Sequence, residues 1–254
     1  MEKRAQVTLF VIIAVLIAAG VIAVIFMQQK AGGEISPTPA DVKPIQSYIE
    51  NCLSETGKEA IMQTGLQAGF YTLPEPFLIY NYVEYIPYLY TDGKKKLLTS
   101  SIVENEISDY IGDEIKECLD NITSFKDFDV IQANYSVKTK ISKDKIAMEL
   151  NYPLTVKKGG FTFRFDTFDY NLKSNFNGAI EIANALLSEY EKNPGMFCLT
   201  CFDELMARHP FMKVAAVPAT SPTIYKDKYI MFILEDEEYK IDDMNFVLRF
   251  IAEA

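Results

Sequence analysis

The longest uninterrupted apolar stretch of the chain runs from Val7 to Met27 and contains neither a charged residue nor a proline. Fourteen of its residues are Leu, Ile, Val or Phe, and these side chains favour lipid over water. A helix of this length rises about 32 Å, against about 30 Å for the hydrocarbon core of a bilayer. The pattern predicts a transmembrane helix at 7–27 that binds the lipid bilayer.

The charges that flank this stretch are asymmetric. Lys3 and Arg4 lie directly before it, so the positive-inside rule predicts a cytoplasmic N-terminus at 1–6 and an extracytoplasmic body. A secretory signal peptide is the alternative, but its apolar region has about 7–15 residues and a small-x-small cleavage site follows it. Here the apolar run is longer and leads into Phe-Met-Gln-Gln-Lys. We therefore expect a retained anchor and a single-pass protein of the cell membrane.

The first ten residues carry a more specific pattern. Lys3-Arg4-Ala5-Gln6-Val7-Thr8-Leu9-Phe10, followed by the apolar stretch, resembles the class III signal of archaeal pilins and archaellins. The resemblance covers about residues 1–27 and implies cleavage between Ala5 and Gln6, after which the helix serves as an anchor or a filament core. Many such proteins have Glu at the fifth mature position, where this chain has Phe10, and this difference favours the anchor. The whole chain is also similar to uncharacterised membrane-anchored proteins of small-genome archaea.

Residues 28–43 contain several glycines and prolines and are predicted to form a spacer between the membrane and the body. The body divides into a helix-rich part, 44–125, and a β-rich part, 126–254. We predict the α+β class: an N-terminal transmembrane helix followed by an extracytoplasmic domain of antiparallel sheet packed with amphipathic helices.

Two amphipathic helices are predicted in the first part of the body, at 44–64 and 101–121, because apolar residues recur there at helical spacing. Ser101 and Glu104 have the spacing of a capping box, which predicts a helix start at Ser101.

The stretch 71–90 between these helices contains six tyrosines and three prolines. Its composition predicts two short edge strands, 77–82 and 85–90, followed by a turn at Asp92-Gly93. The tyrosine rings have two interpretations. They cover a small sheet or lie at the membrane interface, or they form a platform that binds a sugar or a protein partner.

Near-alternation of apolar and polar residues in the second part predicts an antiparallel meander, followed by helices and a final pair of strands. The predicted strands are 130–141, 145–157, 161–171, 225–234 and 244–252, and the predicted helices are 176–193 and 200–208. The acidic run 235–238 is predicted to connect the last two strands.

The four cysteines, Cys52, Cys118, Cys198 and Cys201, are an even number in a body predicted to lie outside the cell, which favours disulfide bonds. The preferred pairs are Cys52–Cys118, which joins the first two helices, and Cys198–Cys201, which closes a short loop. The crossed pairings stay open. Other uses of the thiols are a redox-active CxxC at the last two cysteines and a zinc site made by all four.

No catalytic motif is present. His209 is the only histidine of the chain, and a cationic residue at a helix end explains it. The sequence contains no HExxH, GxSxG, P-loop or GxGxxG. We therefore expect no enzymatic activity, no catalytic or metal-binding residue and no cofactor. Asn121 and Asn134 each begin an Asn-x-Ser/Thr triplet and are candidate glycosylation sites.

The net charge of −10 argues against nucleic-acid binding, which needs clusters of Lys and Arg. The expected function is a binding or structural role at the cell surface, with a protein partner or a second copy of the chain. One alternative is a type IV pilin-like filament subunit processed between Ala5 and Gln6. Another is a thiol–disulfide oxidoreductase that uses Cys198 and Cys201.

Overall fold

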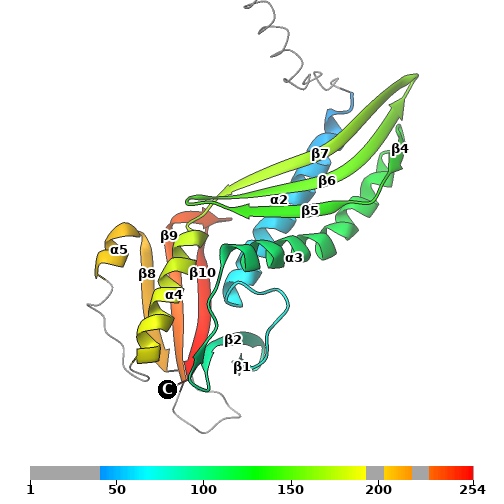
Figure 1. Ribbon diagram of the computed structural model, residues 1–254. Helices are drawn as coiled ribbons and strands as arrows, with labels where there is room; N and C mark the ends of the chain where they lie inside the picture. Colours follow the sequence, from blue (N-terminus) through cyan, green and yellow to red (C-terminus); the bar gives the residue numbers. More distant parts are fainter. Residues whose placement is uncertain (1–40, 193–202, 219–228, 254) are drawn as a thin grey trace, which may run out of the picture. The chain divides into compact units, whose positions relative to one another are not determined.

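A computed structural model describes residues 41–192, 203–218 and 229–253 of the chain (Figure 1). The chain divides into two units, Met1–Lys43 and Pro44–Ala254, and the fold below is that of the second unit. Among the described residues, no helix is both long and apolar enough to cross a bilayer. The predicted transmembrane helix at 7–27 lies outside these residues, as does nearly all of the predicted spacer.

The described residues have a mixed α+β fold, as predicted. The helices are α2 (Lys43–Leu66), α3 (Ser100–Asp120), α4 (Phe176–Lys192) and α5 (Asp203–Arg208), with a 3₁₀ turn η1 (Asn121–Ser124) after α3. The first sheet contains β1 (Phe77–Tyr80), β2 (Glu84–Thr91), β3 (Lys94–Lys95), β8 (Met212–Pro218), β9 (Tyr229–Ile241) and β10 (Met244–Glu253). The second contains β4 (Asp129–Gln132), β5 (Ser136–Ile141), β6 (Lys145–Lys158) and β7 (Phe161–Lys173).

The first sheet has the strand order β1-β2-β10-β9-β8, and β3 pairs with β2. Its pairs are antiparallel except for β2 and β10, which run parallel with Tyr88 opposite Ile251. The prediction that 85–90 is an edge strand is therefore wrong, because β2 lies between β1 and β10 and its centre is buried. The turn at Asp92-Gly93 is confirmed, and both residues have positive φ.

The second sheet is the predicted meander, built around β6. Strand β7 pairs with β6 along most of its length, with a register shift between Asn151 and Leu154, so β4 and β5 share the other edge of β6. The first predicted strand, 130–141, is interrupted at 133–135, and Ala133 bonds instead to the carbonyl of Pro153.

The acidic run 235–238 lies inside β9 and does not connect β9 to β10, so that prediction is wrong. The turn is made by Asp242 and Asp243, both with positive φ. The register shifts between Lys240 and Asp236, which leaves an irregular segment in β9. Asp236 is fully buried there, and its carboxylate accepts hydrogen bonds from the backbone and side-chain nitrogens of Asn175 at 3.2 and 3.1 Å. A buried carboxylate with these partners keeps the acidic run within the sheet.

Helix α2 packs against both sheets through two glycines. A Cβ on Gly57 would lie 2.4 Å from Sδ of Met148, on β6 of the second sheet. A Cβ on Gly65 would lie 2.5 Å from the carbonyl oxygen of Val247, on β10 of the first sheet, and equally close to the Phe246 ring. The helix backbone therefore approaches each sheet more closely than a larger residue allows.

The predicted disulfide between Cys52 and Cys118 is confirmed and joins α2 to α3, with the two Cα atoms 5.9 Å apart. In the chain-entropy model, a cross-link over 66 residues stabilises the fold by about 4 kcal/mol. It also removes two thiolates from the alternative four-cysteine zinc site. Cys198 and Cys201 lie outside the described residues.

Replacing Gly65 with alanine is expected to lower the free energy of unfolding by about 1–3 kcal/mol, because the new Cβ meets backbone that cannot rotate away. Alanine favours the helix over glycine by about 1 kcal/mol, and this gain offsets part of the cost of the steric clash. Urea unfolding of the full chain, followed by circular dichroism, measures the change.

The matched control is Gly112→Ala in α3, where a Cβ has no other atom within 4 Å. This variant is expected to be as stable as the parent or more stable by up to about 1 kcal/mol. Equal effects of the two substitutions would contradict the close packing of α2 on the first sheet.

Candidate functional site

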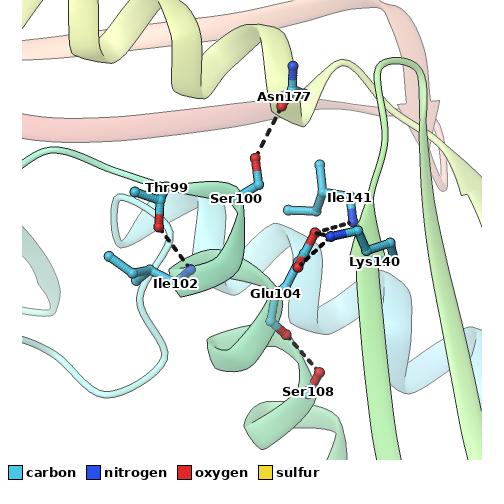
Figure 2. Close-up of polar contacts among 8 residues, drawn as sticks. All are labelled: Thr99, Ser100, Ile102, Glu104, Ser108, Lys140, Ile141 and Asn177. Carbon is cyan, nitrogen blue, oxygen red and sulfur yellow. Dashed lines mark hydrogen bonds and ion pairs between the residues drawn. The ribbon is translucent and has the colours of Figure 1, made fainter.

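The buried carboxylate of Glu104, on α3, has hydrogen-bond partners within the protein (Figure 2). One oxygen accepts from the backbone N–H of Ile141 at 2.9 Å, and the other accepts from the Lys140 ammonium at 3.2 Å. The predicted capping box is therefore wrong, and Thr99 is the N-cap: its hydroxyl oxygen accepts from the N–H of Ile102 at 3.2 Å. Glu104 turns toward β5 because a carboxylate bonded to a buried N–H stabilises more than an exposed cap.

Two neighbouring serines extend this contact network (Figure 2). The Ser108 hydroxyl donates to the carbonyl of Glu104 at 2.7 Å, and the Ser100 hydroxyl donates to the Asn177 side chain of α4 at 3.2 Å. Together these bonds join α3 to the second sheet and to α4. We assign the network a structural role, because its charged and polar atoms bind one another.

The tyrosines of 71–90 do not form one platform. Tyr88 and Tyr90 are buried in the first sheet, while Tyr82 is 77 % exposed at the β1–β2 turn. Tyr71 lies elsewhere, against α3, where its ring meets that of Tyr110 edge-on with 5.0 Å between centroids. The interpretation as a sheet cover therefore holds for part of the stretch.

A groove of about 630 Å³ lies beside α3, in the size range of ligand-binding pockets. We call it the α3 groove. Its lining residues are Tyr71, Thr72, Ser108, Asp109, Gly112, Asp113, Tyr135, Ser136 and Val137. None of the nine is basic, and two are aspartates.

The floor of the α3 groove follows from helical spacing. Asp109, Gly112 and Asp113 stand three and four positions apart, so they share one face of α3. Asp113 accepts a hydrogen bond from the Tyr71 hydroxyl at 3.2 Å. Asp109 makes no hydrogen bond or ion pair within the described ranges and is exposed. The floor thus offers one uncommitted carboxylate next to one that is held in place.

The two walls come from distant segments. Residues 71–72 are held against α3 by Glu106, whose Oε2 accepts from the N–H groups of Tyr71 and Thr72 at 2.8 and 2.9 Å. On the other side, the Tyr135 hydroxyl donates to the carbonyl of Gly112 at 2.9 Å. Both tyrosine rings are therefore fixed before any ligand arrives.

The tyrosine hydroxyls respond to burial and to the surrounding carboxylates. Burial, followed by the charge of Asp113, raises the pKa of Tyr71 above its ordinary value. Burial, followed by Asp120 and Asp113, does the same to the pKa of Tyr135. Both hydroxyls stay protonated at neutral pH and donate hydrogen bonds, while the carboxylates hold the groove at a negative potential.

Metal-ligating side chains do not gather within the part of the chain that the structure describes, which contains no group of three or more His, Cys, Asp or Glu side chains placed to hold a metal ion. His209 follows the short helix α5, and its Nε2 lies 3.2 Å from Oε2 of Glu181 on α4. The His209 ring packs closely on Gly178 of α4, and this contact gives the histidine a structural role.

The remaining candidate residues are those of the glycosylation triplets, the processing site and the CxxC motif. Asn121 and Asn134 are exposed, so both glycosylation triplets are accessible. Asn134 directly precedes Tyr135 of the α3 groove. The possible processing site, Ala5 and Gln6, lies outside the described residues, as do Cys198 and Cys201.

Comparison with protein-family models, with curated proteins and with solved structures finds no match for this chain.

Sequence reasoning did not identify the α3 groove. The only local pattern is Asp109 and Asp113 at i and i+4 on the polar face of a predicted helix. Solvent-exposed helices commonly have such pairs. The tyrosine walls come from segments that the sequence does not place beside α3.

Removing the Glu104 carboxylate tests the structural role of the buried network. Glu104→Ala is expected to lower the free energy of unfolding by about 2–4 kcal/mol, because the N–H of Ile141 is left buried without a partner. Glu104→Gln retains an acceptor and is expected to cost about half as much. Thermal and urea unfolding of the full chain measure both.

Lys140→Ala serves as the control for this experiment. Its side chain is 73 % exposed, so loss of the ion pair is expected to cost no more than about 0.5 kcal/mol. A cost as large as that of Glu104→Ala would contradict a network based on the Ile141 N–H.

Proposed function

We propose that the protein is a single-pass membrane-anchored protein whose extracytoplasmic body binds a cationic group in the α3 groove. The ligand class is an ammonium or guanidinium group with apolar surface beside it, such as a lysine or arginine side chain of a protein partner. The apolar stretch at 7–27 supports the anchor, and the groove supports a binding role.

The Cys52–Cys118 disulfide is the observation that carries the extracytoplasmic location. Disulfides persist in oxidising compartments and are rare where thiol reductants are kept high. The position of the bond, between two helices of the fold's core, is that of a structural cross-link. The basic residues Lys3 and Arg4 before the apolar stretch favour the same orientation.

The chemistry of the α3 groove selects the ligand. Asp109 and Asp113 supply negative charge, and the fixed rings of Tyr71 and Tyr135 supply apolar and π surface. A cation held over a tyrosine face within about 6 Å is attracted by the ring as well as by the carboxylates. Anionic ligands are repelled by the same groups.

Labelling in sealed cells tests the orientation. In a parent with Cys198→Ser and Cys201→Ser, an exposed thiol is introduced by Lys143→Cys at the β5–β6 turn. A second variant carries Glu2→Cys before the apolar stretch. The Lys143→Cys variant is expected to react with a membrane-impermeant maleimide in intact cells, and the Glu2→Cys variant only after permeabilisation. Reaction of both only after permeabilisation would overturn the proposed orientation.

Binding of a fluorescent peptide, Gly-Arg-Gly-Lys-Gly, tests the α3 groove. We expect Asp109→Asn with Asp113→Asn to weaken binding by the full chain about tenfold or more, since each lost charge-assisted bond is worth about 1.5–3 kcal/mol. Fluorescence anisotropy in detergent at about 0.15 M salt measures the affinity.

A matched variant removes two carboxylates elsewhere. Glu149 and Asp169 face each other across β6 and β7 and are exposed. Glu149→Gln with Asp169→Asn makes the same change in net charge and is expected to alter binding less than twofold. If both double variants weaken binding equally, the peptide senses only the acidic body and the groove is not the site.

A further inference from the structure

Among the described strands, β7 has the longest edge that no other strand covers. It pairs with β6 on one side only, and Figure 1 shows it along the border of the second sheet. Alternate residues of an edge strand turn their backbone N–H and C=O groups outward, so a long edge can pair with a strand of another chain. We call the outer side of Phe161–Lys173 the β7 edge.

The other edges of the described sheets have features that discourage such pairing. Strands β1 and β4 have four residues each, and β8 ends in Pro218, which cannot donate a ladder hydrogen bond. Strand β5 packs against α3, where Glu104 accepts from the N–H of Ile141. The β7 edge contains no proline, and its one lysine, Lys173, stands at the last position. An intermolecular strand pair therefore fits best at the β7 edge.

The side chains of β7 change their facing in the middle of the strand. The less exposed ones, which face the core side of the sheet, are Phe163, Phe165, Phe168, Tyr170 and Leu172. The rings of Phe165 and Phe168 have centroids 5.6 Å apart, although a regular strand puts residues three positions apart on opposite faces. Asp166 and Thr167 between them are both exposed. This reversal coincides with the register shift in the β6–β7 ladder.

The reversal makes β7 complementary to itself. Two antiparallel copies, with a two-fold axis between Asp166 and Thr167, place each of these residues opposite the other one in the second copy. The further pairs are Phe165 with Phe168, Arg164 with Asp169, Phe163 with Tyr170, Thr162 with Asn171, and Phe161 with Leu172. Each pair shares one face of the sheet and joins apolar with apolar, polar with polar, or opposite charges. Such cross-strand pairs are the unit that stabilises a sheet.

Neighbouring registers lose this match. A shift by one residue places core-facing rings opposite solvent-facing polar residues, for example Phe165 opposite Thr167 or Asp169. A shift by two residues places Asp166 opposite Asp169 in one direction and opposite Phe165 in the other. The strand therefore selects one register with itself, as a self-complementary two-fold interface requires.

Charges on the solvent face favour the same register. Within one copy, Asp169 lies opposite Glu149 of β6, and both of these like charges are exposed. The Arg164 side chain is 68 % exposed, and its Nε lies 2.8 Å from Oδ1 of Asp166. A guanidinium has five N–H donors, so it can also bond to Asp169 of the second copy. Two such cross-strand ion pairs offset the repulsion between Glu149 and Asp169.

We propose that the protein forms a two-fold dimer in which the β7 edges of two copies pair antiparallel about Asp166 and Thr167. The second sheets of the two copies then form one continuous sheet, and the half-buried aromatic side chains along the edge are covered. Because each copy uses the same edge, the assembly closes at two chains and does not extend into a fibre. This inference depends on neither the membrane anchor nor the α3 groove.

Charge swaps across the proposed axis test the dimer in the full chain in detergent. Arg164→Asp sets like charges opposite each other at two symmetric places, and Asp169→Arg does the same. Each variant is expected to weaken dimerisation about tenfold or more, since two attractive cross-strand pairs become repulsive. Sedimentation equilibrium in a density-matched detergent measures the dissociation constant.

Combining the two swaps tests the register. The double variant with Arg164→Asp and Asp169→Arg restores both opposite-charge pairs and is expected to dimerise within about twofold of the parent. A mixture of the two single variants is expected to form heterodimers as tightly as the parent dimerises, because every aspartate then faces an arginine. The control is Lys143→Asp at the exposed β5–β6 turn, which makes the same change in net charge as Arg164→Asp and is expected to have no effect.

The outcomes decide between this dimer and other contacts. A monomeric parent chain overturns the proposal. If the parent dimerises and neither single swap weakens the dimer, another surface or the apolar stretch at 7–27 makes the contact, and the β7 pairing is overturned. If both swaps weaken it but neither the double variant nor the mixture recovers, the pairing about Asp166 and Thr167 is wrong. Unaltered circular dichroism of every variant shows that the fold is intact.

Discussion

The close approach of one helix to two sheets is the constraint on which the rest of this fold depends. The described strands of the two sheets do not pair with each other, and α2 contacts both. It does so through Gly57 on the second sheet and Gly65 on the first, where the absence of a side chain lets the backbone come near. Dispersion contacts of this kind are weak singly and strong in sum, and they fail when the surfaces are held apart.

Helix α3 is held in place by its contacts with α2. The Cys52–Cys118 bond joins the two helices, and the Tyr48 hydroxyl donates to the carbonyl of Cys118 at 2.8 Å. At its other end α3 is held to β5 by Glu104. With both ends fixed, the polar face of α3 becomes the floor of a groove whose geometry does not depend on a ligand.

The proposed binding surface is acidic. The α3 groove is lined by two aspartates and by no basic residue. Carboxylates that face a groove hold it at a negative potential, which favours a cationic partner over an anionic one.

The sequence by itself determined the elements whose order is local. Helical spacing identified α2, α3 and α4, and alternation identified the β6–β7 hairpin, because each pattern records one buried face within a single element. The Cys52–Cys118 pair was also predicted, as the preferred pairing of an even number of cysteines, although the sequence left the crossed pairings open. Only the tertiary structure decided the features that segments far apart in the sequence form together. Parallel pairing of β2 with β10 sets Tyr88 opposite Ile251, which lies 163 residues further along the chain. The register shift in β9 accompanies the hydrogen bonds between Asn175 and Asp236. The α3 groove likewise needs Tyr71 and Tyr135 beside Asp109, and no local pattern specifies a contact between segments that meet only when the chain is folded.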